Sequence, residues 1–381
     1  MTIREAEAKS ILRKHKKIDS WFISRYGMNL YRGCSHNCVY CDGRSEGYYV
    51  EGEFGKDVAV KTNAIEVLNR ELDPRRKRVP LKRGFIMVGG GVGDSYQPIE
   101  KKYELTRRAL QLIAEHRLPV HMLTKSTLIE RDIDILKRIN EETQAIVSFS
   151  FSSVNDDISS IVEPGVPSPS RRLKTIEKFK NEGIACGMFL LPVIPFITDT
   201  AQLIEDAVSK AKDAGVDFVI FGCMTLKEGR QRDYFMNLAN RLYPEIVARY
   251  YTVYKGSKWG EPTREYSASA NMRFGSIAKK YRMPVRIPFA LFKDLPSETD
   301  LVVVLLEHID YILRLQGKAS SFGYAAYSLS QQKEPLSNIK TDLRRIKGVG
   351  EAAEAIILEI LRTGNSSYYE QLVSQMWRTP D

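Results

Sequence analysis

Short apolar runs alternate with longer amphipathic stretches between residues 28 and 222. Runs of this length suit buried strands, and the amphipathic stretches have the spacing of surface helices. Strands are expected at 28–32, 84–90, 119–125, 145–151, 184–192 and 217–222, and helices near 57–73, 98–116, 128–140, 170–183 and 200–215. Strands and helices that alternate along a chain predict a parallel sheet with helices packed outside it.

Six such units make fewer than the eight of a closed barrel, so we expect an α/β fold, a partial (β/α)6 TIM-type barrel. In barrels of this kind the functional residues lie at the C-terminal ends of the strands. Unusual residues follow every expected strand: three cysteines, then "GGGVGDSYQP" (89–98), Lys125 and Ser126, Ser150, Ser152 and Ser153, "PVIP" (192–195), and "GCMTLKEGR" (222–230). The pattern therefore predicts that these residues share one rim.

Beyond the barrel, the 381 residues suggest a second, smaller unit. We expect a basic N-terminal extension (1–25), the partial barrel (26–255), a helical or irregular connector (256–335) and a small C-terminal α-helical domain (336–381). No apolar run approaches the ~20 residues of a membrane span, so no membrane partner is expected. The charged start, with Glu5 and Glu7, fits neither a signal nor a transit peptide, which predicts a cytoplasmic protein.

The net charge of +10 is partly concentrated in two runs, "RKHKK" (13–17) and "RRKRVPLKR" (75–83). Such runs are most often solvated surface. The functional alternative is contact with phosphates, because Lys and Arg displace the counterions condensed on nucleic acid. Charge alone does not decide between these two interpretations.

Three of the five cysteines, Cys34, Cys38 and Cys41, lie within eight positions of one another. A structural zinc site needs four ligands, usually as two pairs, and only His36 is near enough to be a fourth. Cys186 begins the fifth expected strand and should lie at the opposite end of the barrel. An iron–sulfur cluster held by three thiolates fits this spacing better, and it leaves one iron open for a ligand outside the protein.

The C-x-x-x-C-x-x-C pattern after a first strand resembles that of the radical S-adenosylmethionine (SAM) superfamily. Longer segments, including "NLYRGCSHNCVYCDGRS" and "EPGVPSPSRRLKTIEKFKNEGI", resemble its branch named after spore photoproduct lyase, over roughly residues 25 to 255. The resemblance implies a 4Fe-4S cluster on the three cysteines and SAM as the second cofactor. It also implies reductive cleavage of SAM to a 5′-deoxyadenosyl radical, and an electron donor such as ferredoxin or flavodoxin.

The same resemblance suggests which residues hold SAM. Tyr40 is expected beside the adenine, and Lys125 beside the carboxylate of SAM. The remaining expected contacts are Asp94 and Ser95 for the amino group, Ser150 and Ser152 for the ribose, Arg172 as a second charge partner, and Gly91 among the glycines that let backbone approach a ligand. Glu163 and Pro164 match the family pattern, but no chemistry follows for them.

One departure from the repair enzyme concerns the group that returns a hydrogen atom to the product. Spore photoproduct lyase carries a cysteine near the end of its second strand, where this chain has Gly91. Cys223, after the sixth strand, is a candidate substitute, although a buried structural thiol is the slightly favoured alternative. Tyr96 is the other candidate for this catalytic step.

The C-terminal segment 336–372 reads as helix, "KGVG" turn and helix, which resembles the helix–hairpin–helix of DNA repair proteins. In that arrangement Gly348 and Gly350 bring a helix N-terminus against a phosphate, and Lys347 adds charge. The alternative is a helical hairpin used only for packing.

Two enzymatic functions and one binding function remain open at this point. The first is a radical SAM enzyme that repairs or modifies a nucleic-acid base, with DNA favoured over RNA as the partner. The second is a radical SAM enzyme that modifies a protein or small molecule, with the C-terminal hairpin as a docking module. The third is a cluster-containing binding protein, against which the intact SAM pattern argues.

Overall fold

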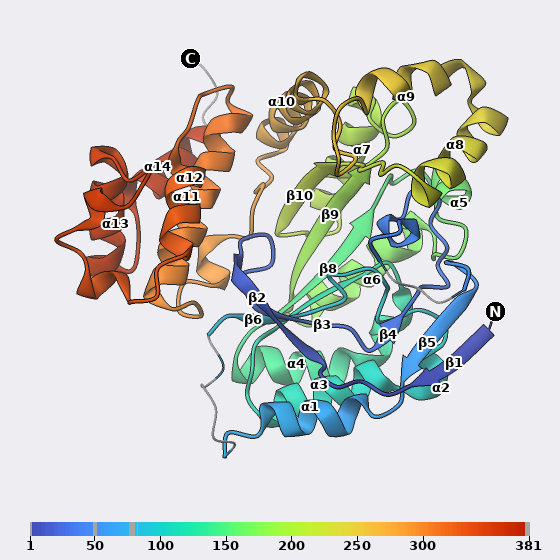
Figure 1. The fold of residues 1–381 in the computed structure, drawn as a ribbon, viewed down its shortest axis with the longest axis horizontal. Helices are drawn as coiled ribbons and strands as arrows, with labels where there is room; N and C mark the ends of the chain where they lie inside the picture. The colour runs from blue at the N-terminus through green and yellow to red at the C-terminus, as the bar shows by residue number, and fades with distance from the viewer. Residues whose placement is uncertain (1, 49–51, 76–80, 82, 378–381) are drawn as a thin grey trace.

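A curled seven-stranded sheet forms the centre of the protein (Figure 1). The computed structural model describes residues 2–48, 52–75, 81 and 83–377. The strands in spatial order are β10 (Phe218–Cys223), β9 (Ala185–Val193), β8 (Ala145–Phe151), β7 (Val120–Thr124), β6 (Phe85–Val88), β3 (Ser24–Met28) and β2 (Leu12–Asp19). All neighbours are parallel except β2, which runs antiparallel to β3. The expected partial barrel is therefore confirmed.

Amphipathic helices cover the outside of this sheet (Figure 1). Their apolar stripes bury residues such as Leu110, Leu136, Ile176 and Val208, because residues three and four positions apart lie on one helix face. The helices that follow the barrel strands are α1 (Ala64–Leu72), α2 (Glu100–Tyr103), α3 (Leu105–Glu115), α4 (Ile133–Glu142), α5 (Asp156–Val162), α6 (Pro169–Asn181), α7 (Ala201–Asp213), α8 (Arg230–Leu242), α9 (Val247–Val253) and α10 (Arg264–Tyr281).

The N-terminal part of the chain differs from the expected elements. The first barrel strand is Ser24–Met28, not 28–32, because the chain bends at Leu30 and Tyr31 begins a strand of a second, small sheet. That sheet joins β1 (Thr2–Ala6), β5 (Asp57–Lys61) and β4 (Tyr31–Arg32). Residues 57–61 were expected in a helix, but the buried Val58 and Val60 alternate with the partly exposed Asp57, Ala59 and Lys61, the two-residue period of a strand.

Aromatic side chains fill the interior of the barrel. Phe22 stacks on Phe189 with ring centroids 4.9 Å apart, and His121 meets both rings edge-on. His121 is fully buried, its Nε2 lies 2.8 Å from Ser148 Oγ, and burial lowers its pKa to about 3. The neutral His121 ring therefore belongs to the aromatic core that fills this part of the barrel.

A group of C-terminal helices packs beside β2 (Figure 1). These helices are α11 (Glu298–Leu315), α12 (Phe322–Ser330), α13 (Glu351–Thr363) and α14 (Ser367–Met376). Of the helices in the described part of the chain, none is both long and apolar enough to cross a membrane.

Helix α11 is attached to the first strands of the barrel by a buried ion pair. Arg25 of β3 donates from Nε to Asp300 Oδ2 at 2.8 Å, and the two side chains are 6% and 1% exposed. Arg25 also donates to the carbonyl of Lys16 in β2 at 3.4 Å. Further along α11, Glu307 pairs with Lys17 of β2. One guanidinium therefore joins β2, β3 and α11.

We expect Asp300→Asn to lower the free energy of unfolding by about 3 kcal/mol, because it leaves the buried charge of Arg25 uncompensated. Denaturant unfolding followed by circular dichroism would measure the loss. Arg314→Ala is the matched control on the same helix, since Arg314 pairs with Asp310 but is 62% exposed, and it should cost less than about 1 kcal/mol. Equal losses in both variants would contradict the importance of the buried pair.

Candidate active site

The three clustered cysteines lie in one well-ordered loop that follows β4. Cys34 and Cys38 are buried, Cys41 is partly exposed, and all three thiols are free. The chain turns after Cys38, because the N–H of Cys41 donates to the Cys38 carbonyl at 3.3 Å and the N–H of Arg44 to the Cys41 carbonyl at 3.1 Å. This turn brings three sulfur ligands into one short segment.

Hydrogen bonds from two other barrel loops fix the first half of the cysteine loop. The Gln97 amide accepts from the N–H of Ser35 at 2.9 Å and donates to the carbonyl of Gly33 at 3.1 Å. On the opposite side, the N–H of Gly165 donates to the carbonyl of His36 at 3.0 Å. A Cβ at Gly165 would lie 2.7 Å from that carbonyl oxygen, so only glycine permits this approach.

A separate hydrophobic cluster holds the second half of the loop. Val39 and Tyr40 are buried with Val162 of α5, Ile194 and Phe235 of α8. Hydrogen bonds support this packing, since the N–H of Val39 donates to the Val162 carbonyl at 3.0 Å. The loop is thus held rigidly before any ligand binds, as ligation by a short segment requires.

The donor set fits an iron–sulfur cluster. Burial raises the pKa of Cys41 to about 11 and that of Cys38 well above its ordinary value, so these thiolates need a cationic partner. Among the described residues, no three Cys, His, Asp or Glu side chains are grouped to hold one metal ion. In a cluster, by contrast, each thiolate binds a different iron.

A buried carboxylate, Glu163, connects the cysteine loop to the barrel. It accepts hydrogen bonds from Arg172 Nη2 at 2.6 Å and from the hydroxyl of Tyr40, and Lys125 Nζ lies 4.0 Å away. Burial alone would raise the pKa of Glu163, but Arg172, Lys125 and Tyr40 lower it below its ordinary value. Arg172 also donates to the carbonyl of Ser150 at 2.5 Å. We call Glu163, Arg172, Lys125 and Tyr40 the Glu163 network.

A second carboxylate, Asp94, lies on the other side of Lys125. It accepts from the backbone N–H of Lys125 and from the Thr124 hydroxyl, each at 2.7 Å, and lies 3.4 Å from His36 Nδ1. Burial would raise the pKa of Asp94, but the His36 ring and these hydrogen bonds lower it to about 2. The site therefore presents a fixed negative charge at Asp94 and a positive one at Lys125.

The structure brings together several of the residues that the sequence analysis expected to bind SAM. Lys125 Nζ donates to Ser150 Oγ at 2.5 Å and lies 5.9 Å from the ring of Tyr40. Ser152 Oγ is buried and has no hydrogen-bond partner among the described residues. Ser95 is buried, and its carbonyl accepts from the Thr106 hydroxyl. Of the two adjacent arginines, Arg172 is buried and Arg171 exposed, so Arg172 is the one that faces the interior.

Sequence reasoning missed the structural position of Glu163. The only signal was its match to the family pattern together with Pro164, from which no chemistry followed. Its importance depends on the approach of Tyr40 and Arg172, which are 123 and 9 positions away in the chain. Contacts of this kind are not visible in spacing or periodicity.

Neither residue expected to relay a hydrogen atom lies at this network. Tyr96 is fully buried, and its hydroxyl donates to Asp132 Oδ2 at 2.9 Å, which ties it to the start of α4. Burial raises the pKa of Cys223 to about 12, and its charged neighbours are Asp199 and Arg273 near α7 and α10. Tyr96 and Cys223 are therefore held by contacts within the fold, away from the Glu163 network.

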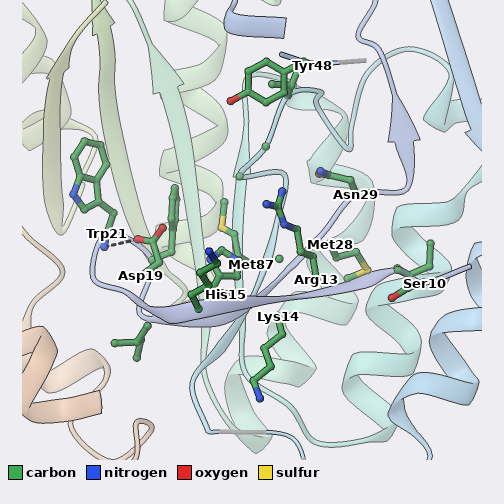
Figure 2. A pocket seen from close by; sticks show the side chains of 18 of the residues that line it. Ser10, Arg13, Lys14, His15, Asp19, Trp21, Met28, Asn29, Tyr48 and Met87 are labelled. Atoms are coloured by element: carbon green, nitrogen blue, oxygen red, sulfur yellow. Dashed lines mark hydrogen bonds between the residues drawn. The ribbon is translucent and has the colours of Figure 1, made fainter. Parts of the chain in front are cut away.

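A large cavity of about 1190 Å³ opens beside the cysteine loop (Figure 2). Its rim includes Gly33, directly before Cys34, and Gly90 to Val92 after β6. Gly91 thus lies in the lining, while the other residues assigned to SAM do not. The opposite wall is formed by residues 13–19 of β2. Sequence analysis had placed these residues in an N-terminal extension.

The C-terminal "KGVG" turn lies in the separate helical group (Figure 1). Residues 336–338 and 343–345 form only short 3-10 turns, so the expected helix before the turn is wrong. Gly348 has φ +89°, and a Cβ there would lie 2.5 Å from the ring of Tyr324, which gives this glycine a packing reason. Lys347 Nζ lies 5.9 Å from the same ring.

The first turn of α13, which follows Gly350, carries Glu351 and Glu354. The negative charges of these two carboxylates would repel a phosphate at this helix N-terminus. The second basic run, 75–83, lies largely outside the described residues, since 76–80 and 82 are not described.

Comparisons with known proteins agree with this geometry. The family model described as the radical SAM superfamily matches residues 28–207. An uncharacterized protein of Mycobacterium tuberculosis is 31% identical over 263 residues, which cover 68% of this chain and 75% of that protein. An uncharacterized protein of Methanocaldococcus jannaschii is 29% identical over 223 residues, or 58% and 78% of the two chains.

Among solved structures, spore photoproduct lyase complexed with dinucleoside spore photoproduct superposes with a TM-score of 0.54, 15% identity, and coverage of 73% of this chain and 79% of that one. A double mutant of the same lyase with bound AdoMet gives a TM-score of 0.53 at 16% identity and the same coverage. At these identities the likeness establishes the fold. Together with the cysteine loop and the family match, it leads to one conclusion: this chain belongs to the radical SAM superfamily and has a spore photoproduct lyase-like fold.

Proposed function

We propose that this chain is an enzyme that cleaves SAM reductively and acts on a nucleic-acid base. The observation that carries the proposal is the Glu163 network beside three free thiols, with Asp94 and Lys125 offering opposite charges. SAM carries an ammonium and a carboxylate on the same carbon. The carboxylate of Asp94 suits the ammonium of SAM, and the adjacent ammonium of Lys125 suits its carboxylate.

Each residue of the site has a definite task in this proposal. Cys34, Cys38 and Cys41 would hold a 4Fe-4S cluster, which supplies the electron that splits SAM into methionine and a 5′-deoxyadenosyl radical. Asp94 would accept from the SAM ammonium, and Lys125 would pair with its carboxylate. Further contacts with SAM are assigned to Tyr40, Gly91, Ser95, Ser150, Ser152 and Arg172.

The burial of this site also serves the chemistry. A carbon radical abstracts hydrogen from any accessible donor, so the protein has to position the substrate and exclude competing groups. Glu163 holds Tyr40 and Arg172 in place without taking part in the reaction. An external donor such as ferredoxin or flavodoxin would deliver the electron.

Two observations support a nucleic-acid substrate. The chain carries a net charge of +10, which favours a polyanion. Spore photoproduct lyase, which has a similar fold, has been solved with a dinucleoside spore photoproduct, and this supports our preference for DNA over RNA. Contacts of Lys347, Gly348 and Gly350 with the phosphate backbone stay part of the proposal on the sequence pattern alone, and Glu351 and Glu354 in the first turn of α13 act against them.

We expect wild-type protein, reconstituted anaerobically with iron and sulfide, to form 5′-deoxyadenosine when dithionite and SAM are added. Cys38→Ala should lose the visible absorbance of the cluster, because it removes one of the three thiolate ligands, and should form no 5′-deoxyadenosine. Cys186→Ala is the matched control, because Cys186 is a buried thiol in β9. If wild type holds a cluster and forms no 5′-deoxyadenosine, the proposal is wrong.

The substrate is tested in the same assay with ultraviolet-irradiated DNA, RNA or neither. A nucleic acid that is a substrate should change the rate of 5′-deoxyadenosine formation and yield an altered base detectable by mass spectrometry. A response to RNA alone would reverse the preference for DNA. No response to either would favour a protein or small-molecule substrate.

A further prediction concerns SAM affinity. We expect Lys125→Met to weaken SAM binding by roughly 10- to 100-fold, because it removes a charge-assisted hydrogen bond worth about 1.5–3 kcal/mol. Equilibrium dialysis on the reconstituted protein would measure the change, with iron content as the check on integrity. Lys137→Met is the control, since Lys137 pairs with Glu182 on the surface. Unchanged SAM affinity in Lys125→Met would remove Lys125 from the site.

A further inference from the structure

The basic run "RKHKK" (13–17), expected in an N-terminal extension, forms the central part of β2, where Arg13, Lys14 and Lys16 are exposed to solvent. This strand pairs with β3 and forms one wall of the cavity beside the cysteine loop. The cavity lining contains six Lys or Arg residues and two acids: Arg13, Lys14, Lys16, Lys17, Arg32 and Lys61 against Asp19 and Glu307. Of the six, Lys14 directs its charged side chain to the opposite face of β2 (Figure 2). Positive charge therefore dominates a concave surface.

Both acids in the lining are already engaged by the protein. Asp19 Oδ1 accepts from the N–H of Trp21 at 2.8 Å, and Glu307 pairs with Lys17. Arg13, by contrast, forms no hydrogen bond or ion pair with any described residue, although it lies in the cavity wall. Its guanidinium keeps all its donors for a ligand.

Strand alternation separates the basic residues of β2 into two sets (Figure 2). Arg13 and His15 lie on the side of Met87, inside the cavity, whereas the side chain of Lys14 points to the other side of the strand. The ring of His15 packs over Gly27 of β3, where an added Cβ would lie 3.0 Å from Nε2. One face of β2 is thus directed into the cavity.

The cavity also offers aromatic surface. Trp21 and Phe22 line one end, and Tyr48, which is 40% exposed, lies at another part of the wall. Nucleobases stack on such side chains with little dependence on sequence. The volume of about 1190 Å³ exceeds the range of ~300–1,000 Å³ typical of small-molecule pockets, so there is room for more than one small ligand.

We propose that Arg13 binds a backbone phosphate of a DNA strand, so that β2 directs one nucleotide into the cavity toward the cysteine loop. The inference rests on the proposed function and adds where the substrate enters. A bidentate guanidinium suits a phosphate better than an ammonium does, because its donors match two oxygens at once. The concave, positive wall strengthens this contact, since clefts focus the field of their charges.

The test is binding of a fluorescein-labelled 12-nucleotide single-stranded DNA to the reconstituted protein, measured by anisotropy at several salt concentrations. We expect Arg13→Ala to weaken binding about 10-fold and to reduce the slope of log affinity against log salt by about 0.7, the loss of one phosphate contact on a single strand. Arg13→Lys should recover part of the affinity.

Lys14→Ala is the matched control, because it removes one positive charge from the adjacent position of the same strand. It should change the affinity by less than about twofold, the effect of one exposed charge screened by salt. Circular dichroism and iron content establish that each variant is folded. If the two alanine variants weaken binding equally, general surface charge explains it and the role of Arg13 is wrong.

The remaining outcomes separate this inference from the proposed function. If wild type cleaves SAM and binds DNA but Arg13→Ala binds like wild type, only the entry site is wrong. If wild type cleaves SAM but binds no DNA, both the inference and the nucleic-acid substrate fail. Binding of the matching RNA alone overturns the choice of DNA. If wild type cleaves no SAM, the enzymatic proposal fails whatever the binding shows.

Discussion

The candidate site depends on the compensation of one buried carboxylate. Glu163 is buried, and its charge is compensated by Arg172 and Lys125 and by hydrogen bonds from Tyr40 and Ser159. These partners come from the cysteine loop, the end of β7 and the start of α6. Loss of Glu163 would leave a buried guanidinium unpaired and would release Tyr40, so the loop geometry and the barrel rim are set by the same interaction.

The Glu163 network and the cavity divide the site into two parts with different electrostatics. Around Glu163 and Asp94 every charge has a partner at short range, and the arrangement is rigid. Along β2, Arg13 lines the cavity and has no hydrogen-bond or ion-pair partner among the described residues. The first part suits a small zwitterion that replaces existing contacts. The second suits a larger anion that brings its charge from outside, and Gly91 borders the cavity near the cysteine loop.

Much of the barrel could be predicted from sequence because its parallel strands are buried on both faces and appear as continuous apolar runs, as in Ala145–Phe151. The cysteine loop was predictable because three ligands lie within one segment. The role of β2 was not, since Arg13 to Lys17 look like surface charge until β3 is placed beside them. Glu163 was missed for a similar reason, as its partners are distant in sequence. In the C-terminal segment, glycine spacing suggested a helical hairpin, but Gly348 is explained by the approach of Tyr324.

The C-terminal helices touch the barrel at the strand that forms the cavity wall. Arg25 joins the backbone of Lys16 to Asp300, Glu307 holds Lys17, and His308 lies 3.2 Å from the carbonyl of Ser20. Strand β2 lies at the edge of the main sheet, with only β3 as a neighbour there, so α11 acts as its brace. The C-terminal helical group therefore contributes to the structure of the barrel and is more than an added module. A relative that exchanged it for another module would have to rebuild the support of β2, which couples the evolution of the C-terminus to the shape of the cavity wall.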